Sequence, residues 1–298
     1  MPPTAYDEFA YFEDNAVEVG LPYDGPPTVE RVTVPLDTGR SLSALRWGDG
    51  PPELVLLHGG AQNAHTWDTV ALALDRPLLA VDLPGHGHSD HRPDKAYWPE
   101  ENARAVAVAV RELAPEARAV VGMSLGGLTA LALAGNEPSL VRGLVTVDVT
   151  PGVDKDKASA ITAFIAGPET FATFDEILER TVLFNPTRTE SSLRRGILHN
   201  AHELPDGSWA WRYDRFHLDE GQEVPEFGSL WNIYDGLTMP FMLVRGADSP
   251  VVDDADVAEV RRRLPSARVE VVPAAGHSIQ GDHPLALAAL LQEFVPES

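Results

Sequence analysis

The sequence predicts an α/β fold with a mostly parallel, doubly wound sheet, and two features lead to this expectation. Short apolar runs alternate along the chain with longer segments of helical character. Most of these runs are apolar throughout, as in strands that are buried on both faces of a parallel sheet. The 298 residues suffice for one large α/β domain or two small ones.

Eight apolar runs are the expected strands. They are VERVTVPL (29–36), SLSALRWG (41–48), ELVLLH (53–58), LLAVD (78–82), AVVGM (119–123), GLVTVDV (143–149), FMLVRG (241–246) and RVEVVP (268–273). The expected helices of the same part of the chain are 64–74, 99–114, 125–136, 254–264 and 284–295. Ligand sites of such sheets lie beyond the carboxyl ends of the strands, so chemically active residues are expected there.

The alternation is interrupted between the sixth and seventh strands, where residues 152–236 contain no clear strand pair. The expected helices of this interval are 155–166, 170–184 and 189–201, followed by the aromatic stretch SWAWRYDRF (208–216). An insertion of this length is too long for a loop, so we expect a helical cap or lid. The expected division of the chain is an irregular lead-in at 1–28, an α/β core at 29–151 and 237–298, and the cap at 152–236.

The composition limits the binding partners and the cellular location that we expect for this protein. The chain has 23 Lys and Arg residues against 45 Asp and Glu, a formal charge of −22, and such a surface repels nucleic acid and anionic membranes. It has no cysteine, which excludes disulfides and a thiol nucleophile. The acidic start MPPTAYDEFAYFEDNA contains no apolar run, and no run approaches the roughly 20 residues that span a bilayer. We therefore expect a cytoplasmic protein, whose oligomeric state is left open.

A strand-to-helix junction carries the most informative motif. Gly122-Met123-Ser124-Leu125-Gly126 follows a strand and opens a helix, which is the G-x-S-x-G pattern of a nucleophile elbow. The glycines permit a tight turn that projects the serine hydroxyl from the sheet. Taken alone, the pattern also fits a serine that only caps the helix.

Two further motifs favour a nucleophilic serine. The run HGG (58–60) ends the third strand, and we expect the backbone N–H groups of Gly60 and Leu125 to form an oxyanion hole. The run AGH (275–277) follows the last strand and supplies His277 as the expected general base. The simpler readings are a plain strand-end turn for the glycines and a surface loop for the histidine.

Together, four runs resemble the α/β-hydrolase superfamily in order and spacing over about residues 29–295. They are HGG (58–60), DLPGHGHSD (82–90), GMSLGG (122–127) and AGH (275–277). The resemblance implies the α/β-hydrolase fold, with a mostly parallel eight-stranded sheet and a helical cap inserted after strand 6. It also implies a serine-esterase-like triad in the order serine, acid, histidine.

The run HGHSDH (86–91) raises a different possibility, because its spacing is that of binuclear zinc hydrolases of the metallo-β-lactamase type. Imidazole and carboxylate ligands suit zinc. In the α/β-hydrolase resemblance, however, the run belongs to the D-x-x-G-x-G-x-S loop at 82–89, and the chain offers no second ligand set with matching spacing. We therefore expect no metal, and we expect the pair His199 and His202 on the surface rather than as ligands.

The acid of the triad has two candidates. The family's usual acid follows the seventh strand in a G-x-x-D turn, but here Ser249 holds that position and Asp248 comes one residue earlier. In part of the family the acid follows the sixth strand, where Asp148 stands 24 residues after Ser124. We expect Asp148 to be the acid and keep Asp248 as the alternative. The other aspartate would then cap a cap helix or bond the backbone of its own turn.

These motifs predict a serine hydrolase that cleaves carboxylic esters through an acyl-enzyme. Small to medium, largely apolar substrates are expected, because some cap aromatics should line the pocket while most pack the cap. The candidates are Phe164, Phe171, Phe174, Trp209, Trp211, Phe216, Trp231 and Tyr234. No cofactor is expected, since the dinucleotide and phosphate-loop motifs are missing. A thioester, lactone or C–C bond hydrolase or a perhydrolase would use the same triad, and a non-catalytic protein that binds a small ligand is the alternative of another class.

Overall fold

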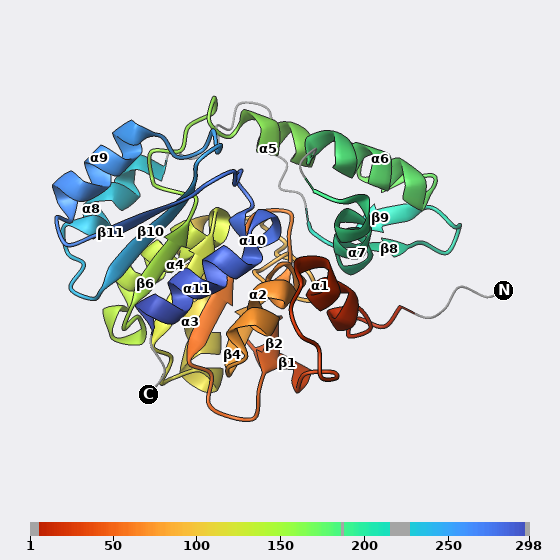
Figure 1. The fold of residues 1–298 in the computed structure, drawn as a ribbon, viewed down its shortest axis with the longest axis horizontal. Coiled ribbons are helices and arrows are strands. Elements are labelled where there is room, and N and C mark those ends of the chain that lie inside the picture. Colours follow the sequence, from red (N-terminus) through yellow and green to blue (C-terminus); the bar gives the residue numbers. More distant parts are fainter. Residues whose placement is uncertain (1–5, 186–187, 215–226, 296–298) are drawn as a thin grey trace.

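The central sheet contains the eight expected strands in the order β1-β2-β4-β3-β5-β6-β10-β11 (Figure 1). The computed structural model describes residues 6–185, 188–214 and 227–295. The strands are β1 (Val29–Pro35), β2 (Ser41–Trp47), β3 (Leu54–Leu57), β4 (Leu78–Val81), β5 (Ala119–Met123), β6 (Leu144–Val147), β10 (Phe241–Gly246) and β11 (Arg268–Val272). The pairs β1–β2 and β2–β4 are antiparallel and the others are parallel, so the predicted fold class is confirmed.

Helices cover both faces of the sheet, which explains the continuously apolar strands. Every residue of β3, β4, β5 and β6 is buried. One apolar cluster joins the sheet to α2 (Asp68–Leu74) and α11 (Pro284–Phe294). A second cluster joins its other face to α3 (Pro99–Leu113), α4 (Leu125–Asn136) and α9 (Asp254–Arg263), so that the two sets of helices lie in front of and behind the sheet in Figure 1.

The strand register brings chemically active residues to one edge. Met123 at the end of β5 pairs with Val147 at the end of β6, and Val147 also pairs with Val244 of β10. The residues that follow β5 and β6 are Ser124 and Asp148, so both emerge at the carboxyl edge of the sheet. This is the edge at which open α/β sheets bind their ligands.

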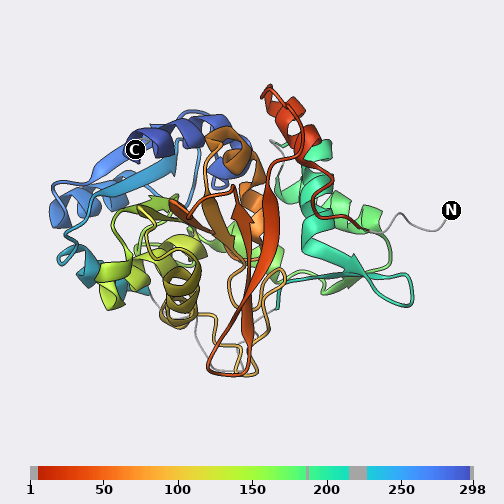
Figure 2. The same cartoon turned by 90° about the horizontal axis from the view of Figure 1, so that it is seen from below.

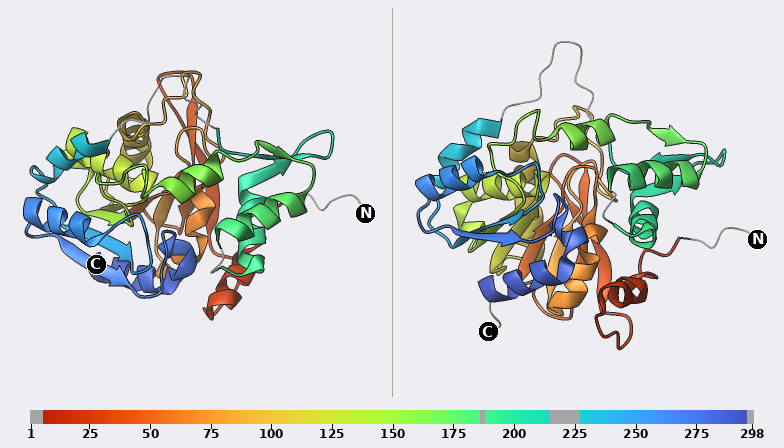
Figure 3. Two further views of the ribbon diagram at one scale, coloured as in Figure 1. Left: turned by 90° about the horizontal axis from the view of Figure 1, so that it is seen from above. Right: turned by 45° about the horizontal axis from the view of Figure 1, so that its top comes forward.

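The insertion between β6 and β10 is not entirely helical, which corrects the expected helical cap. Its described elements are α5 (Ser159–Ile165), β7 (Thr170–Phe171), α6 (Phe174–Phe184), α7 (Glu190–Asn200), β8 (Ala201–Glu203), β9 (Trp209–Trp211), η3 (Phe227–Leu230) and α8 (Trp231–Tyr234). The three strands form a small antiparallel sheet in the order β7-β9-β8. Strands of two or three residues are too short to show a period-2 pattern in the sequence. In Figure 3, α5 leads from the core to α6, α7 and this sheet, which lie to one side.

The last helix of the interval packs on the core. Leu230 and Tyr234 are buried in the apolar cluster that contains α4, and Trp231 packs against the same cluster. A Cβ on Gly135 of α4 would lie only 2.9 Å from Cδ1 of Ile233, which shows how closely α8 approaches α4. Of the aromatic residues considered for the pocket, Trp231 and Tyr234 therefore pack against the core.

The segment before β1 contains a helix, which corrects the expected irregular lead-in. Helix α1 (Phe12–Val19) lies beside α7 of the insertion, as Figures 1 and 2 both show. Phe12 is buried against Trp47, with ring centroids 5.0 Å apart. Arg195 of α7 donates to Asn15 and forms an ion pair with Glu18. Such tertiary contacts stabilise a short helix whose own sequence gives only a weak signal.

Within the described ranges, no helix is both long and apolar enough to cross a membrane.

Candidate active site

Ser124 occupies a strained turn between β5 and α4. Its backbone has φ 51° and ψ −120°, a region that residues with a side chain rarely adopt. Its hydroxyl makes no capping bond to α4, so the helix-cap reading does not describe it, and the residue lines a large cavity. A Cβ on Gly122 would lie 2.2 Å from the Gly126 carbonyl oxygen, and one on Gly126 would lie 2.3 Å from the Leu57 oxygen. Both glycines are therefore required for the turn.

Asp148 and His277 form a direct hydrogen bond. Nδ1 of His277 lies 2.7 Å from Oδ2 of Asp148, a carboxylate that is fully buried at the end of β6. With Nδ1 donating to this carboxylate, Nε2 of the imidazole is left to accept a proton. Oδ1 of Asp148 accepts the Gly246 N–H at 2.9 Å, and Oδ2 also accepts the Ser249 hydroxyl. His277 lines the same cavity as Ser124.

The alternative acid lies at the surface. Asp248 is exposed, and its backbone N–H donates to the Ala275 carbonyl at 2.9 Å. Ser249, which holds the family's usual acid position, instead donates its hydroxyl to Asp148. Of the two candidate carboxylates, Asp148 is thus the one that the structure brings to His277. The supporting role of Ser249 was not indicated by the sequence, because a turn serine has many possible partners.

The two expected oxyanion donors are near Ser124 in different ways: Leu125 follows it in the chain, and Gly60 lines the same cavity. Leu125 is the first residue of α4, so its N–H has no acceptor within the helix. Gly60 lines the cavity, and a Cβ placed on it would meet Cδ1 of Ile165 at 3.8 Å. The neighbouring Gly59 N–H is already bonded to the Gln62 side chain at 3.1 Å.

Two buried histidines hold the glycine loop in place. Nε2 of His58 accepts the Leu83 N–H at 2.9 Å, and Nε2 of His86 accepts the Ala61 N–H at 3.2 Å. Burial lowers the pKa of His58 to about 3, so its imidazole is neutral and can accept this bond. These bonds join the loop after β3 to the loop after β4, and Ala61 itself has a strained φ of 58°.

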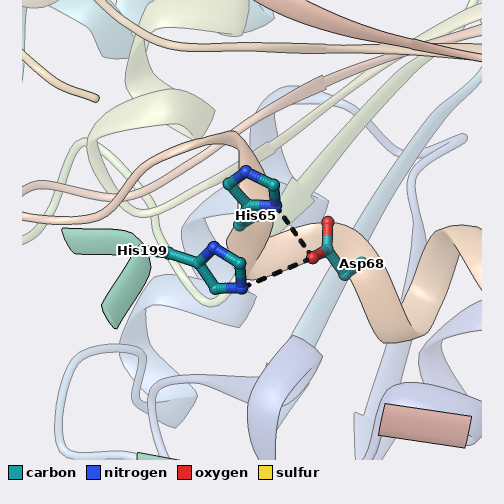
Figure 4. Close-up of side chains that lie close together, drawn as sticks. All are labelled: His65, Asp68 and His199. Atoms are coloured by element: carbon teal, nitrogen blue, oxygen red, sulfur yellow. Dashed lines mark hydrogen bonds and ion pairs between the residues drawn. The ribbon is translucent and has the colours of Figure 1, made fainter. Parts of the chain in front are cut away.

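The HGHSDH run is divided among separate interactions. His86 supports Ala61, whereas Oδ2 of Asp90 accepts the Ser41 N–H at 2.7 Å and His91 is exposed. In the described part of the chain, the side chains close enough to share an ion are His65, Asp68 and His199, none of which belongs to this run (Figure 4).

The cluster of His65, Asp68 and His199 is better suited to an ion pair than to a metal. The two imidazole rings stack with centroids 3.9 Å apart and an interplanar angle of 14°, so their nitrogen lone pairs lie in nearly parallel planes. His65 lies between the carboxylates of Asp68, at 2.9 Å, and Glu8, at 3.0 Å. His199 is buried, contrary to the expected surface position, and its Nδ1 lies 2.7 Å from the Tyr6 hydroxyl.

Charge is divided unequally between the two stacked rings. Burial alone would lower the pKa of His65, but the carboxylates of Asp68 and Glu8 outweigh it and raise the pKa to about 9. For His199, burial and the nearby charge of His65 lower the pKa well below its usual range. A protonated His65 therefore stacks on a neutral His199, and the pair joins the lead-in, the core and the insertion.

The His65 cluster should make stability depend on pH. Because the folded-state pKa is raised from 6.5 to about 9, the stabilisation is complete below pH 6.5 and is lost as the pH rises through about 9. We expect His65→Gln to lower the free energy of unfolding most at pH 6.5, and this difference from wild type should shrink by up to about 3 kcal/mol toward high pH. Urea unfolding of both proteins from pH 6.5 to above about pH 9 measures this difference in the free energy of unfolding.

His91→Gln is the matched control, since His91 is exposed. A destabilisation by His65→Gln that is the same at every pH would show that His65 packs without carrying the charge. Asp68, Glu8, Arg31 and His199 face His65 and remain in both variants.

The cavity over Ser124 has a volume of about 700 Å³ and is lined by both the core and the insertion. Its aromatic lining comprises Phe164, Trp211 and Phe184, the last of which the sequence did not single out. Phe171, Phe174 and Trp209 belong to the apolar cluster inside the insertion, and Phe216 lies outside the described residues. An apolar wall therefore faces the carboxyl edge of the sheet.

Comparison with known proteins agrees with this fold. The model of the alpha/beta hydrolase fold family matches residues 52–284. The chain belongs to the α/β-hydrolase fold family. Esterase Rv0045c of Mycobacterium tuberculosis is 46% identical over 297 residues, which cover 97% of this chain and 96% of that protein. A solved structure of the same esterase has a TM-score of 0.86 at 45% identity and covers 99% of this chain and 100% of that one.

A more distant relative is a lipase. The sn-1-specific diacylglycerol lipase ABHD11 of Mus musculus is 30% identical over 251 residues, which cover 78% of this chain and 77% of that protein. These similarities identify the chain as an enzyme, an α/β-hydrolase related to esterases.

Proposed function

We propose that this α/β-hydrolase cleaves carboxylic esters through an acyl-enzyme formed on Ser124, with His277 as general base and Asp148 as the acid of the triad. The observation that carries the proposal is the 2.7 Å bond between His277 and the buried Asp148, beside a cavity that Ser124 also lines. The proposal includes the division in which residues 152–236 act as a cap over residues 29–151 and 237–298.

The proposed reaction has two steps. His277 accepts the proton of Ser124 through Nε2 as the serine attacks the ester carbonyl, and Asp148 stabilises the imidazolium without taking the proton. The oxyanion then lies against the N–H groups of Gly60 and Leu125. His277 returns the proton to the leaving alcohol, and a water activated by the same imidazole releases the acid and restores Ser124.

The cavity and the relatives support an ester with an apolar acyl chain. Phe164, Phe184 and Trp211 form an apolar wall over the reacting residues. The M. tuberculosis protein is an esterase and ABHD11 is a diacylglycerol lipase, and both reactions release a carboxylic acid from an ester. A thioester hydrolase would use the same residues, so a substrate panel accompanies the first assay.

A fluorophosphonate probe tests the mechanism directly. We expect it to label Ser124, as located by peptide mass, and expect the labelling to disappear in Ser124→Ala and in His277→Ala. The labelling reactions of the wild type and of both variants contain a chelator, because transition metals inhibit the M. tuberculosis esterase. Labelling at another serine, or ester turnover in the absence of any labelling, would disprove the mechanism. An absence of both labelling and turnover would favour a protein that only binds a small ligand.

A further inference from the structure

One cation in the wall of the cavity has no carboxylate partner among the described residues. Lys157, Arg188 and Arg195 all line the cavity. Lys157 is paired with Asp253 and Asp256, and Arg195 is paired with Glu18. For Arg188, in contrast, the described bond of the guanidinium is the one that it donates to the Ser192 hydroxyl.

The guanidinium of Arg188 is held close to the helix that follows His277. A Cβ on Gly281 of α10 (Ile279–Asp282) would lie 3.0 Å from Cζ of Arg188. The Nε of Arg188 is buried and has no hydrogen-bond partner in the described part of the chain. A buried donor without a partner is costly, and a buried charge without one is costlier still.

The surroundings do not neutralise this charge. Burial lowers the pKa of Arg188, which is the sign of a cation with too little compensation, although Asp282 and Glu18 act on it from a distance. Oδ2 of Asp282 accepts the Gly276 N–H at 2.9 Å, and Glu18 is bonded to Arg195. The nearby carboxylates are thus engaged by other groups.

We propose that Arg188 binds an anionic oxygen group of the substrate, a carboxylate or a phosphate, in the cavity that Ser124 also lines. The planar guanidinium matches both groups, and pairing would compensate its charge. A local cation is also the means by which a protein of net charge −22 can hold an anion. This inference rests on the proposed ester hydrolysis and refines its substrate class to apolar chains that carry a negative charge.

Matched series of esters separate the effect of a substrate's charge on kcat/KM from the effect of its chain length. Monomethyl esters of dicarboxylic acids of increasing length are compared with methyl esters of the corresponding monocarboxylic acids and with methyl esters of ω-phosphorylated acids. We expect the wild-type enzyme to prefer one anionic series, and expect Arg188→Gln to lower kcat/KM for that series by about 10- to 100-fold, with the neutral esters changed by no more than about twofold. Whichever anionic series shows the loss identifies a carboxylate or a phosphate as the group.

Two variants control for charge and folding. Arg188→Lys keeps the charge and should retain part of the preference, whereas Arg194→Gln removes a neighbouring cation of α7 that does not line the cavity and should change nothing. Equal losses for neutral and anionic esters in Arg188→Gln would overturn the proposal, as would the absence of an anionic preference in the wild type.

A binding measurement tests Arg188 without turnover. Free dicarboxylates and ω-phosphorylated acids should raise the Tm of the wild-type protein and of Arg194→Gln but not of Arg188→Gln. If neutral esters are hydrolysed while no anion binds, this inference fails and the proposed function stands. If anions bind through Arg188 while no ester is hydrolysed, the proposed function fails and the anion site stands.

Discussion

Replacement of Ser124 by alanine is expected to lower kcat for ester hydrolysis by at least about 10⁴-fold while the protein remains folded. The hydroxyl is the proposed nucleophile, and neither the glycine loop nor His277 can form the acyl-enzyme in its place. Because the serine side chain caps no helix, its removal costs no structural bond at α4. Steady-state kinetics with a neutral ester and thermal unfolding of the same sample measure the two effects.

Ser124→Gly provides a matched control on stability. Both variants lack the hydroxyl, but alanine keeps the strained φ of 51° whereas glycine relieves it. We therefore expect Ser124→Gly to be equally inactive and more stable than Ser124→Ala by about 1 kcal/mol. Substantial turnover in either variant would remove Ser124 from the mechanism.

The second large effect is expected for the acid of the triad. Asp148→Asn should lower kcat by about 10⁴-fold, because the amide carries no charge to stabilise the imidazolium and can hold the wrong tautomer of His277. The geometry around the position should survive, since the Asn carbonyl oxygen can still accept the Gly246 N–H. Kinetics on a neutral ester, with circular dichroism to confirm folding, measure the loss.

Asp248→Asn is the comparison that makes this prediction specific. Asp248 is exposed, and its variant carries the same replacement of a carboxylate by an amide. The kcat of Asp248→Asn should therefore stay within about twofold of the wild-type value. If Asp248→Asn abolished turnover and Asp148→Asn did not, the assignment of the acid would be wrong despite the bond between Asp148 and His277.

The sequence by itself determined the sheet, the order of its elements and the turn at Ser124. Strands buried on both faces must be apolar throughout, and this pattern is visible residue by residue. The glycines at 122 and 126 are required by clashes within a few ångströms of the turn itself, so a local motif was sufficient to locate it. His277 could be named because it follows the last strand of a recognisable order.

Only the tertiary structure shows that Asp148 is bonded to His277. On a turn, one residue changes the direction of the side chain, and no pattern in the sequence records that direction. The same reason applies to His65 and His199, which are 134 residues apart and stack only because the short 3-10 helix η1 (Ala64–Trp67) meets α7. It applies also to Arg188, whose lack of a carboxylate partner depends on where Asp282 and Glu18 are engaged. Local backbone demands can be read along a chain, whereas the choice of a partner depends on which distant segments the fold brings together.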